Sequence, residues 1–139
     1  MNVKWKQNAQ RAGDLLAVLS NTFRIELLYA VGTGEVCVCH LEELLDKRQP
    51  YISQHLSVLR EAGVLTDRRE GRYVFYRVSD LAVFDLLEKA AEIQGIPEND
   101  LPVVKKPLPR PGCPCPSCQD EVLISLPTIR SRSKITDDH

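Results

Sequence analysis

The fold is decided by residues 49–78, which read QPYISQHLSVLREAGVLTDRREGRYVFYRV. The first half predicts a helix over about 49–62. Pro50 suits the first turn, where its missing N–H costs nothing, and Gly63 suits the end. The apolar side of this helix has helical spacing and consists of Ile52, Leu56 and Leu59, with Val58 beside them.

The second half of the stretch predicts a β-hairpin. β-Branched and aromatic residues lie on both sides of Glu70-Gly71, which indicates a tight tip between strands of about 64–69 and 72–78. A helix that runs directly into a short basic hairpin is typical of a DNA-binding unit with a wing.

Upstream, a short helix is expected at about 40–46, separated from the helix at 49–62 by a polar break, which suggests a helix-turn-helix. Further helices are predicted at 3–19, 22–31 and 80–94 from their apolar periodicity. We therefore expect a mainly α chain with a β-hairpin wing, a winged helix-turn-helix.

The polar start of the helix at 49–62 is the candidate DNA-reading surface, because the second helix of such a pair enters the major groove. Residues 47–77 carry seven basic and three acidic side chains, although the whole chain has a net charge of only −1. The candidate DNA-binding residues are Gln49, Tyr51, Ser53, Gln54 and His55 on the helix, with Arg68, Arg69 and Arg72 at the hairpin. The alternative is that these are surface residues of a protein-binding module.

The sequence argues against a membrane protein, a secreted protein and an enzyme. The chain has 139 residues, and no apolar run approaches the roughly 20 residues that a membrane span needs. The N-terminal residues lack a secretory apolar stretch, so we expect a cytoplasmic protein. No nucleophile is matched with a base and no catalytic carboxylate pair is evident, so we do not expect an enzyme.

Five cysteines form two groups, which in a reducing compartment points to metal or redox chemistry. They are Cys37 and Cys39, then Cys113, Cys115 and Cys118. Eight of the nine prolines lie between Pro97 and Pro127, so residues 96–139 are expected to form a largely irregular tail after a domain at 1–95.

Thiolates favour soft ions, so all five cysteines are candidate ligands of arsenite, cadmium or lead, with zinc less favoured. On a regular helix Cys37 and Cys39 would point about 200° apart, so a shared ion would require an extended start to the short helix. The tail group either completes the site at Cys37 and Cys39 or forms its own. Thiol oxidation is an alternative signal, and haem is a weaker one suggested by the Cys-Pro pairs.

Several motifs resemble the ArsR/SmtB family of metal-sensing repressors. Residues 35–41 (EVCVCHL) are similar to its cysteine box, and residues 49–56 (QPYISQHL) are similar to its recognition helix. Residues 59–65 and 69–76 resemble the turn into its wing. The resemblance covers about residues 15–80 and implies a homodimer that represses a resistance operon, through a palindromic DNA operator, until an inducer binds.

The sequence departs from the family pattern in ways that bear on sensing. His40 replaces a usual acidic residue, Arg48 replaces a common capping serine, and Glu42 stands where some arsenic sensors have a third cysteine. No histidine lies between positions 56 and 138, so the zinc-binding set of the last helix is missing. These departures favour sulfur ligation.

The apolar stripe of the first helix has nothing in its own short domain that obviously covers it, so the first and last helices are expected to form a dimer interface. Such a two-fold protein would match the symmetry of a palindromic operator. The alternative is that both helices pack into the core of one protomer. The proposed interface residues are Trp5, Ala9, Ala12, Leu16 and Leu19 on the first helix, with Phe84, Leu87 and Ala91 on the last.

Overall fold

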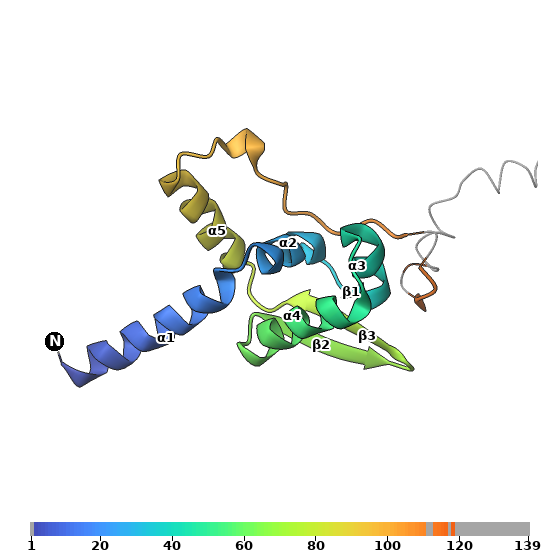
Figure 1. Ribbon diagram of the computed structural model, residues 1–139, viewed down its shortest axis with the longest axis horizontal. Coiled ribbons are helices and arrows are strands. Elements are labelled where there is room, and N and C mark those ends of the chain that lie inside the picture. Colours follow the sequence, from blue (N-terminus) through green and yellow to red (C-terminus); the bar gives the residue numbers. More distant parts are fainter. Residues whose placement is uncertain (1, 111–112, 117, 119–139) are drawn as a thin grey trace, which may run out of the picture. The chain divides into compact units, whose positions relative to one another are not determined.

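The computed structural model describes residues 2–110, 113–116 and 118, and the chain divides into two compact units, residues 1–107 and 108–139. Figure 1 shows the elements of the first unit. They are α1 (Val3–Leu19), α2 (Thr22–Val31), β1 (Val36–Cys37), α3 (Val38–Leu45), α4 (Gln49–Glu61), β2 (Leu65–Glu70), β3 (Tyr73–Val78), α5 (Ala82–Ile93) and a 3₁₀ turn (Glu98–Asp100). The predicted helices and hairpin are confirmed. Most of the predicted irregular tail lies outside the described residues.

The helix boundaries follow from local capping chemistry. Asn21 caps α2, because its side-chain oxygen accepts a hydrogen bond from the Arg24 N–H at 3.1 Å. Arg48 precedes α4 without a side-chain cap, and Pro50 occupies the first turn. The helix-turn-helix thus consists of α3 and α4, with only residues 46–48 between them.

The sheet has three antiparallel strands in the order β1-β3-β2, so β1 joins the wing hairpin. This two-residue strand was not predicted. Val36 lies opposite Tyr76, and Cys37 lies opposite Phe75. Phe75 in turn lies opposite Arg68 on β2. The segment before α3 is therefore hydrogen-bonded to the wing.

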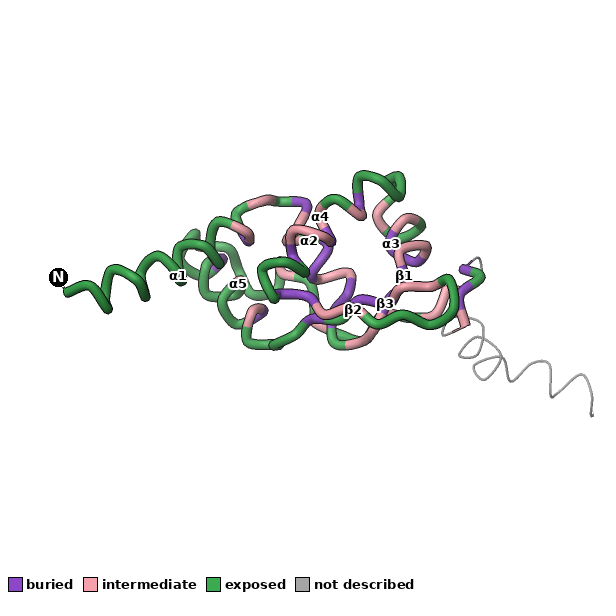
Figure 2. Tube along the Cα trace, turned by 90° about the horizontal axis from the view of Figure 1, so that it is seen from below, coloured by how far each residue is buried: buried purple, intermediate pink, exposed green. Residues whose placement is uncertain are grey.

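The core lies among α2, α3, α4 and the sheet, where Figure 2 shows the buried segments. It is built from the apolar faces that the sequence predicts, and it includes Leu27, Leu28, Leu41, Ile52, Leu56, Leu59 and Tyr76. Burial of these faces is the main stabilising contribution, at about 25 cal/mol per Å² of apolar surface. It fixes α4 against the rest of the first unit.

Helix α1 is exposed along nearly its whole length (Figure 2). Trp5 and Leu16 are 50% and 53% exposed, as an interface helix requires, but Leu19 is buried. Phe84 on α5 is also buried, and its ring lies 5.2 Å from that of Tyr29. The assignment of Leu19 and Phe84 to a dimer interface was wrong, because both belong to the core of the protomer.

Residues 101–107, called the strap below, return from the end of α5 toward the start of β1 (Figure 1). The Thr33 N–H donates a hydrogen bond to the Lys105 carbonyl at 3.2 Å. Gly32 has a φ of +61°, and a Cβ there would lie 1.9 Å from the Lys105 oxygen. Glycine is therefore required at Gly32 by both its backbone conformation and the close approach of the strap.

Candidate functional site

The start of α4 presents a polar face to solvent. Gln49 and Gln54 are exposed and Ser53 is half-buried, with the Gln49 amide donating to the Ser53 hydroxyl at 2.7 Å. These three side chains can offer both donors and acceptors, which is the chemistry that contacts base edges in a major groove.

Tyr51 and His55 have a second, structural role. Their rings lie 4.8 Å apart, and both pack on Phe23 of α2, at 4.8 and 5.2 Å. The Arg24 Nε–H donates to His55 Nδ1 at 3.2 Å. Burial, and then the nearby Arg24 charge, lower the pKa of His55 from its ordinary value.

This depressed pKa predicts a pH dependence of stability. The folded protein holds His55 neutral, so His55 contributes stability that is complete above the unfolded-state pKa near 6.5. That contribution is lost as the pH falls below this value toward the folded pKa. We expect the urea midpoint to fall between about pH 7 and pH 5, and to fall less in His55→Gln. Equal slopes for the two proteins would contradict this assignment.

The three hairpin arginines lie in different environments. Arg69 and Arg72 are exposed, and the Arg72 guanidinium lies 6.0 Å from the centroid of the Tyr73 ring. Arg68 instead makes a two-pronged ion pair with Glu35, at 2.8 Å from Nη2 to Oε1 and 3.1 Å from Nε to Oε2. Its guanidinium also lies 4.6 Å from the Phe75 ring centroid.

The Glu35–Arg68 pair joins the wing to the segment just before Cys37. The hydrogen bond from Arg68 is the largest influence on Glu35 and holds the pKa of that carboxyl below its ordinary value. Arg68 remains 47% exposed, so the pair contributes modestly to stability. Sequence reasoning missed Glu35; the available signal was an acidic residue two positions before Cys37, which places both on one face if that segment is extended.

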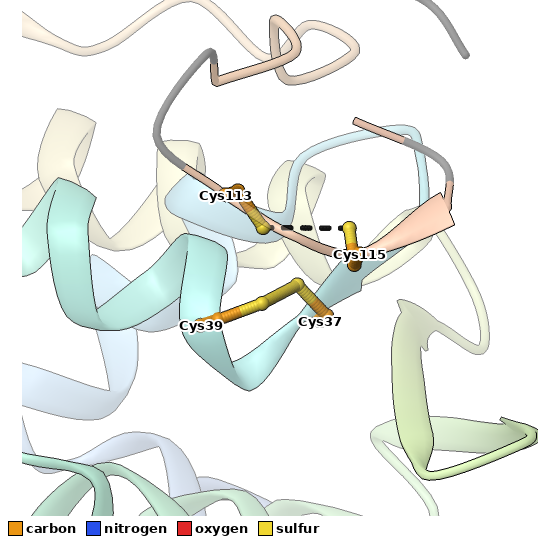
Figure 3. Close-up of side chains that lie close together, drawn as sticks. All are labelled: Cys37, Cys39, Cys113 and Cys115. Atoms are coloured by element: carbon orange, nitrogen blue, oxygen red, sulfur yellow. Dashed lines mark hydrogen bonds between the residues drawn. A yellow bond between two sulfur atoms is a disulfide. The ribbon is translucent and has the colours of Figure 1, made fainter. Parts of the chain in front are cut away.

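Cys37 and Cys39 lie at the junction of β1 and α3, where Figure 3 shows their sulfurs joined in a disulfide. Cys37 has an extended backbone and is the N-cap of α3, its sulfur accepting from the His40 N–H at 3.4 Å. The sulfurs therefore meet without unwinding α3. Cys37 thus has the extended backbone that the sequence analysis required for a shared site, and it has this backbone because it precedes the helix.

The tail cysteines form a sulfur group of their own in the second unit. The Cys113 thiol donates to Cys115 Sγ at 3.4 Å, shown as a dashed line in Figure 3. Burial raises the pKa of Cys113 to about 12 and also raises the pKa of Cys118. Once the Cys37–Cys39 disulfide is reduced, both cysteine groups offer sulfur donors, which suit a soft ion better than a hard one.

Comparison with known proteins identifies the family to which this chain belongs. Residues 23–67 match the family model described as "Bacterial regulatory protein, arsR family". A "Biofilm growth-associated repressor" of Agrobacterium fabrum is 38% identical over 96 residues, which cover 69% of this chain and 82% of that protein. The chain belongs to the ArsR family. The resemblance to ArsR/SmtB metal-sensing repressors is thereby confirmed, and this family binds operator DNA.

The names of two other relatives refer to arsenical and to cadmium resistance. An "Arsenical resistance operon repressor" of Escherichia coli is 44% identical over 48% of this chain and 57% of its own length. A "Cadmium resistance transcriptional regulatory protein CadC homolog" of Staphylococcus aureus is 33% identical over 61% of this chain and 71% of its own. The chain thus spans little more than half of the arsenical relative.

Solved structures confirm the winged helix-turn-helix. "Reduced HlyU" from Vibrio cholerae is 30% identical, with a TM-score of 0.57 over 65% of this chain and 95% of that one. A Mycobacterium bovis domain titled "homodimeric winged helix-turn-helix DNA-binding domain" has a TM-score of 0.60 at 20% identity, over 68% of this chain and 88% of that one. Within the described part of this ArsR-family chain, no helix is long and apolar enough to cross a membrane.

Proposed function

We propose that this protein is a cytoplasmic, dimeric repressor that releases its DNA operator when a soft metal or metalloid ion binds its cysteine thiolates. The observation that carries the proposal is the position of Cys37. It ends β1, which is hydrogen-bonded to the wing, and it caps α3, the first helix of the helix-turn-helix. An ion at this cysteine therefore acts on both parts of the DNA-binding unit.

The DNA-binding surface consists of the first turns of α4 and the tip of the wing. Gln49, Ser53 and Gln54 enter the major groove, with Tyr51 and His55 holding that helix against α2 and facing the phosphates. Arg69 and Arg72 contact the backbone or the minor groove. Arg68 joins them only after it separates from Glu35. The operator is palindromic, in keeping with a two-fold protein.

Gln54→Ala and Ser53→Ala are each expected to weaken specific binding by about 1–3 kcal/mol if the side chain contacts a base. Arg69→Ala and Arg72→Ala should weaken binding to all sequences and lower the salt slope by about 1 each. Gln94→Ala and Lys89→Ala, which remove an amide at the C-cap of α5 and a positive charge from α5, serve as controls. The measurement is affinity for a duplex selected from a random pool, at several salt concentrations. Unchanged affinity in all four variants would exclude this surface.

The inducer is arsenite, or cadmium or lead, with zinc less favoured. Sulfur-only donors support this choice, as do the relatives named for arsenical and cadmium resistance. Two sulfurs at Cys37 and Cys39 leave a three- or four-coordinate ion incomplete. We infer that one or two thiolates from Cys113, Cys115 and Cys118 complete the site, so the domain at 1–95 binds DNA and the tail at 96–139 assists sensing.

The decisive experiment is a titration of the fully reduced protein with arsenite, Cd²⁺, Pb²⁺ and Zn²⁺ while operator binding is followed. Release at stoichiometric ion by one of the first three supports the proposal. An ion acts here by binding the DNA-incompetent conformation more tightly, which shifts the population. If no ion causes release, thiolate sensing of metals is excluded.

Thiol oxidation is the second candidate signal, favoured by the disulfide between Cys37 and Cys39. In that reaction the S–S bond of an oxidant of the disulfide class, such as oxidised glutathione, breaks and takes up two electrons and two protons to give two thiols, while the Cys37 and Cys39 thiols are oxidised and form one S–S bond. Release of DNA by the oxidant in the presence of a metal chelator, with reversal by a phosphine reductant, would favour redox sensing over ion binding.

A further inference from the structure

The Glu35–Arg68 ion pair occupies the side of the arginine that suits a phosphate. The Glu35 carboxylate accepts a hydrogen bond from Arg68 Nη2 at 2.8 Å and another from Nε at 3.1 Å. These two N–H groups form the planar fork with which an arginine binds either a carboxylate or a phosphate through two parallel hydrogen bonds. Glu35 therefore takes the position that a DNA phosphate would take on this guanidinium.

A second carboxylate lies on the other side of the same guanidinium. Glu70 Oε2 lies 3.4 Å from Arg68 Nη1, and the Phe75 ring lies under the guanidinium at 4.6 Å. The three charged side chains, Glu35, Arg68 and Glu70, together have a net charge of −1. A negative group repels a phosphate, so in this arrangement Arg68 adds no attraction for DNA to the wing.

The backbone on both sides of Glu35 is held in place. The Thr33 N–H donates a hydrogen bond to the Lys105 carbonyl at 3.2 Å, and Val36 pairs with Tyr76 in the sheet. All of these contacts lie within the first unit, residues 1–107. Because this backbone is already ordered, the pair with Arg68 costs little further backbone entropy. The fold thus presents the Glu35 carboxylate to the wing from an anchored segment.

We propose that Glu35 competes with DNA phosphate for Arg68 and thereby lowers the operator affinity of the ion-free protein. This inference rests on the DNA-binding surface of the proposed function and adds the residue that restrains it. A phosphate must displace the carboxylate before Arg68 can contact DNA, whereas Arg69 and Arg72 are already exposed. Glu35 acts only through Arg68 and is therefore a positioning residue of the wing.

Glu35→Gln tests the proposal, because it keeps the shape of the side chain and removes its charge. Affinity for a duplex selected from a random pool is measured with reductant and a metal chelator present, so that ion sensing plays no part. We expect tighter binding than in the wild-type protein and a steeper salt dependence. For each wing on the DNA, one added phosphate contact should steepen the slope by about 0.9, so a tenfold fall in salt should increase the variant's advantage about eightfold.

Two controls separate release of Arg68 from a general change of charge. Asp67→Asn removes a negative charge from the neighbouring residue of β2, which pairs instead with Arg60 at 3.5 Å. Its effect on the salt slope should be small. In an Arg68→Ala background, Glu35→Gln should no longer steepen the slope. An equal gain in Asp67→Asn, or a full gain without Arg68, would overturn the proposal.

Arg68→Ala alone gives independent evidence that does not depend on a variant at position 35. It should lower the salt slope less than Arg69→Ala does, because Arg68 contacts a phosphate only after displacing Glu35. Equal losses in these two variants would mean that Arg68 already contacts DNA, which overturns the inference.

The remaining outcomes are distinct. Weaker operator binding by Glu35→Gln would mean that Glu35 orients Arg68 toward DNA, and unchanged binding would mean that the pair has no influence on it. Either result overturns the inference and leaves the DNA-binding surface intact. If the wild-type protein selects no duplex from the pool, the proposed function itself fails, and the inference fails with it.

Discussion

Replacing Cys37 with serine is expected to abolish ion-induced release of DNA while leaving operator binding of the ion-free protein intact. Serine is a strong N-cap, so its hydroxyl can accept the His40 N–H that the Cys37 sulfur accepts, and α3 keeps its start. Serine nevertheless cannot supply a thiolate. The loss of one ligand should weaken ion binding on the order of a hundredfold or more.

The measurement compares operator affinity with and without saturating arsenite or Cd²⁺ in Cys37→Ser, Cys39→Ser and the wild-type protein. Cys37→Ala is the informative control, since it removes both the thiolate and the cap and should also destabilise α3 by about 1 kcal/mol. Truncation after Leu108 should weaken the response strongly without abolishing ion binding at the pair. A normal response in both serine variants would mean that sensing occurs elsewhere in the chain.

Placing a charge on α1 is expected to separate the dimer and remove most operator affinity. Leu16 is a large aliphatic residue in the last turn of α1, yet it is 53% exposed. Leu16→Glu would bury a carboxylate in the proposed interface, which is costly without a partner. Because each protomer then binds one half-site alone, affinity should fall by about 100-fold or more.

Mass in solution, measured by sedimentation at micromolar concentration, should change from dimer to monomer. Val103→Glu is a matched control, because Val103 is 77% exposed on the strap and lies outside the proposed interface. Two results would contradict the prediction: a wild-type monomer that binds the operator fully, or a Leu16→Glu protein that remains dimeric.

Local patterns predicted most of the fold. The helices and the hairpin follow from periodicity, caps and the Glu70-Gly71 tip, and their bounds agree within two residues or so. Strand β1 could not be predicted, because its two residues acquire their structure from hydrogen bonds to β3, some forty positions away. The strap was not predicted either, because a proline-rich segment has no periodicity. It docks through distant contacts, namely the hydrogen bond from Thr33 to the Lys105 carbonyl and the packing of Val104 on the core.

The sequence predicted which chemical groups form the candidate site better than it predicted how those groups are arranged. Grouped cysteines indicate thiolate sensing wherever they lie, but the start of α3 at Val38 decides that Cys37 is outside the helix. The hairpin arginines were predicted as equivalent. Only the tertiary structure distinguishes Arg68, because its partner Glu35 lies 33 residues earlier.

The pairing of Cys37 with Phe75 has a consequence for the order of events in the cell. If an ion at Cys37 weakens DNA binding through the shared sheet, thermodynamic linkage requires that DNA weaken ion binding by the same factor. Repressor bound to its operator then has a lower affinity for the ion than free repressor has. Free repressor would therefore bind the ion first, and repressor would leave the operator only after the free pool is saturated. The number of repressor copies per operator would thus set the ion concentration at which the gene responds.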